Sequence, residues 1–166
     1  MTEVTNKSLI WRQPSFWKRH YELRDGDTLL ASLDQPSIWS SEAIGKGFDG
    51  GWRFKPLDFW NLDIGVSKER QELPFATLRQ RVWKREALLE LPKGKRLYLV
   101  RTFFEGTYSL LDERGVVLLQ LKNKLALKYE AAVQVFTNQF DCPELPWLLI
   151  LTWYVALIRR RRARRG

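Results

Sequence analysis

Apolar and polar residues alternate in short segments through most of the chain, from residue 20 to residue 137. Residues 52–55, for example, read Trp-Arg-Phe-Lys, and a similar alternation runs through residues 129–137. A period of two places one face of a β-strand toward a core and the other face toward water. The pattern therefore predicts a protein that is mainly β-structure.

Turn residues separate the alternating segments. Asp25-Gly26-Asp27 and Asp49-Gly50-Gly51 each lie between two such segments, and glycine provides the positive φ that a tight hairpin turn needs. Roughly ten to twelve short strands at a spacing of about 8–12 residues are typical of an all-β sandwich or barrel. The predicted strands are residues 20–24, 28–33, 44–48, 52–57, 60–66, 75–83, 86–91, 96–104, 107–112, 116–122 and 129–137.

The pattern changes near the C-terminus. Residues 145–158 read LPWLLILTWYVALI and contain no charge, so a helix formed by them would be apolar on every face. Such a helix lies either inside a protein or in a membrane. Its length is about 21 Å, which is short for a bilayer core of about 30 Å. We expect a helix at about residues 146–160, with Pro146 in its first turn.

The two patterns together predict one architecture. Closing a sheet into a barrel removes its exposed edges, and a barrel of about twelve strands is too wide for side chains alone to fill. A helix that is apolar all round can occupy that interior. We therefore expect a closed antiparallel barrel of about twelve strands around a central C-terminal helix. The expected divisions are an N-terminal arm (1–15), the barrel with its helix (16–160) and a basic tail (161–166).

This arrangement resembles the tubby C-terminal-like superfamily, which includes tubby, LURP-one-related and phospholipid scramblase domains. The similarity lies in the hairpins at residues 21–30 and 108–118 and in the position of the 145–158 helix. The resemblance implies a barrel of roughly twelve strands around a hydrophobic helix, and contact with membrane lipids. The C-terminal signature of tubby proteins and the calcium-binding segment of scramblases have no counterpart here, so no ligand residue is transferred.

Composition adds a strong local charge. The 166 residues carry a net charge of +9, and most of it comes from the sequence RRRRARRG at the end of the chain. A basic residue near an anionic bilayer contributes about 1 kcal/mol to binding. Alternatively, the arginines complement the dipole at the end of the helix and keep that end in water. The candidate lipid-binding residues are Arg159, Arg160, Arg161, Arg162, Arg164 and Arg165.

Two further groups of basic residues occur within the barrel sequence. The first is a possible second anion-binding patch that consists of Arg79, Arg81, Lys84 and Arg85. The second consists of Lys122, Lys124 and Lys128. The simpler interpretation is that these residues line solvated strands. A position of both groups on one side of the barrel would favour anion binding more strongly.

The sequence shows no catalytic constellation. His20 is the only histidine and Cys142 the only cysteine, and no base is indicated beside the thiol. We expect a strand position for His20 and a buried thiol for Cys142. Asp49-Gly50-Gly51 lacks the ligand ladder of an EF-hand, and no phosphate-binding loop or Cys/His cluster is present. The sequence thus predicts neither an enzyme nor a metal or cofactor site.

These observations predict a soluble, non-enzymatic domain that binds anionic phospholipid headgroups at a cytoplasmic membrane face. A single cysteine fits a reducing compartment. One alternative is a tail-anchored membrane protein with a cytosolic β-domain. Another is a protein-interaction scaffold whose partner the sequence does not name. Nucleic acid is disfavoured as a partner, because no recognition module accompanies the basic tail.

Overall fold

Twelve antiparallel strands and one long helix make up the part of the chain that the computed structural model describes, namely residues 8–37, 40–58, 63–81, 84–102, 106–124 and 128–165. Of residues 162–165 only the backbone is described. The strands are β1 (Ser8–Arg12), β2 (His20–Asp25), β3 (Thr28–Asp34), β4 (Ala43–Gly47), β5 (Gly50–Pro56), β6 (Ile64–Lys68), β7 (Ala76–Arg79), β8 (Glu86–Glu90), β9 (Arg96–Thr102), β10 (Thr107–Leu111), β11 (Val117–Asn123) and β12 (Glu130–Val135).

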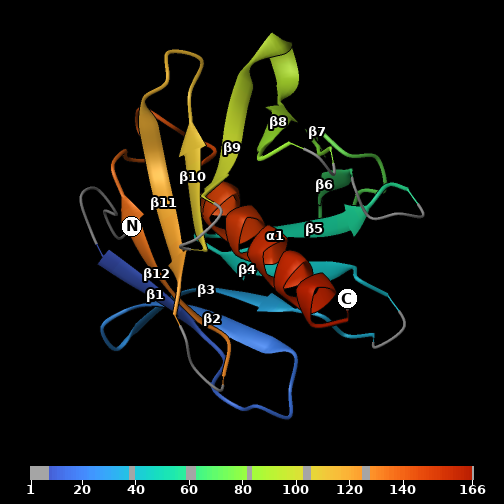
Figure 1. The fold of residues 1–166 in the computed structure, drawn as a ribbon, viewed down its shortest axis with the longest axis vertical. Coiled ribbons are helices and arrows are strands. Elements are labelled where there is room, and N and C mark those ends of the chain that lie inside the picture. The colour runs from blue at the N-terminus through green and yellow to red at the C-terminus, as the bar shows by residue number, and fades with distance from the viewer. Residues whose placement is uncertain are drawn as a thin grey trace.

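The strands form a closed barrel in which each strand pairs with its neighbours in sequence, and β1 closes the ring against β12. A short 3₁₀ helix (Pro92–Gly94) joins β8 to β9, and the helix α1 (Leu145–Arg165) follows β12. Figure 1 shows α1 running through the middle of the curved sheet. The predicted fold class, a closed barrel around one C-terminal helix, is confirmed.

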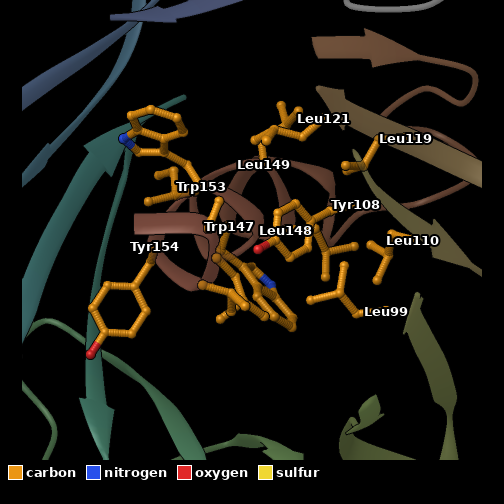
Figure 2. Packing of buried hydrophobic residues seen from close by; sticks show 14 of the residues in the cluster. Leu99, Tyr108, Leu110, Leu119, Leu121, Trp147, Leu148, Leu149, Trp153 and Tyr154 are labelled. Atoms are coloured by element: carbon orange, nitrogen blue, oxygen red, sulfur yellow. The ribbon is translucent and has the colours of Figure 1, made fainter. Parts of the chain in front are cut away.

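The interior of the barrel is built around the aromatic residues of α1. Trp153 stacks on Trp11 of β1 with ring centroids 5.7 Å apart and planes 3° apart, and Tyr21 of β2 meets the same indole edge-on. Tyr154 packs against Phe54 of β5. Side chains therefore leave α1 in several directions and meet strands on different sides of the barrel (Figure 2).

Burial along α1 is nearly complete over its first fourteen residues. Each of the described side chains from Trp147 to Ile158 is at most 6% exposed. Thr152, the polar residue within this run, donates its hydroxyl to the Leu148 carbonyl oxygen at 2.8 Å, so its burial leaves no donor unpaired. The apolar surface that suggested either a core or a membrane is thus covered by the strands.

The helix α1 lies directly against the backbone of β4 at Gly45. A Cβ atom added to Gly45 would lie 2.7 Å from Cγ2 of Ile150 and 2.9 Å from the ring of Phe54. A side chain at position 45 would therefore push the helix away from β4. Glycine within the alternating sequence of β4 thus marks the place where the helix lies against the strand backbone.

Several boundaries differ from the expectations, and three of the differences bear on the architecture. β1 begins at Ser8, inside the segment expected to be an N-terminal arm. Its alternation covers only five residues, with Leu9 and Trp11 buried, and so gives too weak a signal to predict a strand. The β4–β5 turn is formed by Phe48 and Asp49, whose φ angles are 53° and 64°. Gly50 instead pairs with Gly47 as the first residue of β5. Finally, α1 continues to Arg165 rather than ending near residue 160.

Candidate functional site

The antiparallel order of the strands gives the barrel two distinct ends. The loops that follow β1, β3, β5, β7, β9 and β11 all lie at one end, and the remaining connections lie at the other. The last turns of α1 reach the first end, since Arg161 contacts the start of β2 and Arg159 contacts Gln80 after β7. We call this first end the basic end, for the residues described next.

Basic groups that are far apart in sequence come together at the basic end. The loop after β7 carries the Arg79–Arg85 group, the end of β11 and its loop carry the lysine group, and α1 brings the arginine tail. The loop after β1 adds two cations that the sequence analysis did not single out. The described basic residues here include Lys18, Arg19, Arg79, Arg81, Lys84, Arg85, Lys122, Lys124, Lys128, Arg159, Arg160 and Arg161. The described carboxylates at this end are fewer, namely Glu22, Asp34, Glu42, Asp58, Asp63, Glu86 and Glu130.

The opposite end shows no such excess of cations among the described residues. Asp25, Asp27 and Asp49 lie in its hairpin turns. At this end Lys95 forms an ion pair with Glu144 at 3.0 Å, just before the first residue of α1. Charge is thus segregated along the barrel, with the excess of cations where the helix ends.

The first three arginines of the tail bind back to the barrel. Arg159 donates to the side-chain oxygen of Gln80 at 2.6 and 3.1 Å, and Arg160 lies over the ring of Tyr129, 4.5 Å from its centroid. Arg161 donates to the hydroxyl of Tyr21 at 2.7 Å. Burial raises the pKa of Tyr21 in spite of this nearby cation, so the phenol stays neutral and accepts the hydrogen bond.

These contacts divide the predicted tail site. Arg159, Arg160 and Arg161 fix α1 at the mouth of the barrel through side-chain contacts, a structural role that differs from the dipole complementation suggested by the sequence. The side chains of Arg162, Arg164 and Arg165 lie outside the described atoms. Their function as lipid ligands stays a prediction.

The Arg79–Arg85 group surrounds a groove of about 640 Å³ on the outer face of the barrel. All four predicted cations line it, and Leu88 of β8 with Tyr98 and Val100 of β9 form its floor. The cations differ in how closely carboxylates approach them. Arg79 donates to Glu90 at 2.7 Å, and both Arg79 and Arg81 lie within 4 Å of Asp63, whereas Lys84 is exposed.

A smaller hollow of about 340 Å³ lies on the basic end, beside the loop between β1 and β2. Its lining combines three cations with aromatic rings and one amide: Gln13, Phe16, Trp17, Lys18, Arg19, Tyr21, Tyr129 and Arg161. Sequence reasoning missed this site. The available signal was the run Phe16-Trp17-Lys18-Arg19, in which aromatic and basic residues are adjacent in a segment without strand alternation.

His20 and Cys142 have the surroundings of structural residues. His20 begins β2, where its Nδ1 lies 2.7 Å from Asp34 and its Nε2 lies 3.2 Å from Glu22. Cys142 is buried as expected, and burial together with the nearby Glu144 carboxylate raises the pKa of its thiol to about 11. That thiol is therefore protonated at neutral pH, which is the less nucleophilic state.

A small pH dependence of stability is expected from His20. Burial opposes protonation of the imidazole, but the hydrogen bonds and charges of Asp34 and Glu22 outweigh it and raise the pKa above 6.5. The resulting stabilisation is fully present below the unfolded pKa of about 6.5 and is lost as pH rises through the folded pKa. Urea unfolding of the parent and of His20→Gln should therefore differ more at about pH 5.5 than at about pH 8.5. An equal difference at both pH values would contradict this assignment.

Comparison of the chain with protein-family models, with curated proteins and with solved structures finds no match. Among the described residues, no helix is both long and apolar enough to cross a membrane. The same residues contain no cluster of three or more His, Cys, Asp or Glu side chains that could hold a metal ion.

Proposed function

We propose that this protein is a non-enzymatic domain that binds anionic phospholipid headgroups at a cytoplasmic membrane face through its basic end. One observation carries the proposal: three separate basic groups and the tail converge on the same end of the barrel. The Arg79–Arg85 group and the lysine group share this end, although the β7–β8 and β11–β12 loops that carry them are separated around the ring of strands. Among the residues that the structure describes, the opposite end shows no comparable excess of cations.

Electrostatics gives the expected character of this binding. Each Lys or Arg near an anionic leaflet contributes about 1 kcal/mol, and the attraction decays within a Debye length of about 8 Å at physiological salt. A group of cations at one end of a rigid barrel can approach a flat bilayer together. Binding should therefore be peripheral, reversible and strongly weakened by salt.

The geometry of α1 bears on the alternatives. A tail anchor needs an apolar helix surface that can face lipid, and here the apolar residues of α1 pack against strands from β1 to β12. A protein-interaction scaffold fits the same barrel but gives no reason for the accumulation of cations at one end. Kinship with the tubby-like superfamily remains a proposal that rests on the shared architecture.

Sedimentation with liposomes tests the proposal. The full-length protein should pellet with phosphatidylcholine vesicles that contain phosphatidylserine and remain in the supernatant with phosphatidylcholine alone. Raising the salt from low to physiological concentration should release much of the bound protein. Equal binding to neutral and anionic vesicles would refute the proposal, and so would tighter binding to duplex DNA than to anionic vesicles at the same salt.

A further inference from the structure

The loop between β1 and β2 exposes two adjacent aromatic side chains on the basic end. Phe16 is 60% exposed and Trp17 is 84% exposed, and their ring centroids lie 4.5 Å apart. Single exposed apolar residues are common on protein surfaces. Two packed against each other beside a cationic hollow form a small apolar tip with charged surroundings.

The aromatic pair occupies the tip of a turn. The Lys18 N–H donates to the Ser15 carbonyl oxygen at 3.2 Å, so Phe16 and Trp17 are the two central residues of a four-residue turn. Turns favour Gly, Pro, Asn, Asp and Ser at such positions, because these residues fit the backbone or bond to it. Nothing in the turn itself requires aromatic residues.

The loop is held firmly by the barrel. Buried Gln13 donates its side-chain amide to the Lys18 carbonyl oxygen at 2.7 Å, and its backbone N–H donates to Tyr129 of the neighbouring segment. The side-chain ammonium of Lys128 donates to the Pro14 carbonyl oxygen at 3.3 Å. The backbone N–H of Gln35 donates to the Arg19 carbonyl oxygen at 3.0 Å. The barrel thus fixes the direction in which the tip points.

Charge lies immediately behind the aromatic tip. Lys18, Arg19 and Arg161 line the hollow beside the two rings, and Lys128 lies at the edge of the loop. An anionic membrane has the complementary order along its normal, with phosphates outside and apolar chains inside. Trp is also the residue favoured at the membrane–water interface, where its amphipathic ring fits.

We propose, as a deepening of the proposed function and resting on it, that Phe16 and Trp17 insert into the interface of an anionic bilayer. Lys18, Arg19 and Arg161 then face the lipid phosphates. The loop converts a diffuse electrostatic attraction into a fixed orientation, with the barrel axis directed at the membrane. Insertion adds an attractive contribution that salt does not screen.

The double variant Phe16→Ala/Trp17→Ala tests this anchor, with Phe140→Ala as its matched control. Phe140 is 93% exposed in the connection before α1, at the opposite end of the barrel. The double variant should bind anionic vesicles about tenfold more weakly than the parent, and the control should bind like the parent. The ratio should persist at physiological salt, because burial of apolar surface is not screened. All three proteins should melt at the same temperature, since both sites are exposed.

Fluorescence gives a second measurement. Vesicles with brominated acyl chains should quench part of the tryptophan emission of the parent, and Trp17→Phe should lose that part. Quenching that is unchanged in Trp17→Phe, or equal binding by the double variant and the parent, would overturn the anchor while leaving the proposed function intact. A parent protein that fails to bind anionic vesicles at all would instead refute the proposed function and the anchor with it.

Discussion

Replacing Leu149 by Asp is expected to unfold the protein. Leu149 is 1% exposed in α1, in the middle of the barrel, and lies among the leucines of the surrounding strands (Figure 2). An unpaired carboxylate there loses its hydration without gaining a partner, at a cost of several kcal/mol. That cost is comparable to the total stability of a domain, which is about 5–15 kcal/mol. Circular dichroism and the soluble yield on expression should both show the loss.

Leu73→Asp provides the matched control. Leu73 is 83% exposed in the loop between β6 and β7, so the same substitution there should leave the melting temperature nearly unchanged. Val155→Asp should repeat the effect of Leu149→Asp about 1.7 turns further along the helix. Val155 is also 1% exposed. A parent-like melting temperature for both helix variants would show that α1 does not lie inside the barrel.

The fold could be predicted because two strong patterns in the sequence fit one architecture. Alternation of apolar and polar residues between turn residues specifies strands. An uncharged helix that is too short for a bilayer is most easily buried inside the protein. β1 escaped prediction because five residues with two buried positions, Leu9 and Trp11, carry little signal. The strand β1 can be recognised only from the closed barrel, because it pairs with the edge of β12 that would otherwise be open.

The candidate site was predictable only in part. Composition identified the arginine tail and the Arg79–Arg85 group, because clustered charge is visible in any linear sequence. Their convergence depends on which ends of the strands share a side, and that is a property of the closed topology. The pair Phe16 and Trp17 was missed for a different reason. Aromatic residues are usually buried, and only the structure shows that the turn holds both in water.

The division of the tail was also beyond sequence analysis. Six arginines in seven residues look equivalent, yet Arg159, Arg160 and Arg161 each contact a side chain of the barrel. Whether an arginine contacts the barrel or remains available to bind a ligand depends on which part of the barrel its position on α1 faces. Substitution of these three therefore combines a stability effect with any binding effect, and tests of binding are better directed at the residues beyond them.

The most direct test of the central claim compares neutralised charges at the two ends of the barrel. One variant carries Arg162→Gln, Arg164→Gln and Arg165→Gln at the basic end. The control carries Lys68→Gln, Arg70→Gln and Arg96→Gln, three exposed cations at the opposite end, so that both lose the same net charge. At about 1 kcal/mol per residue, the tail variant should bind phosphatidylserine vesicles at low salt about a hundredfold more weakly than the parent. The account predicts that the control binds the vesicles nearly as well as the parent and that all three proteins have the same melting temperature. An equal loss of vesicle affinity in the two variants, or no loss of affinity in the tail variant, would contradict it.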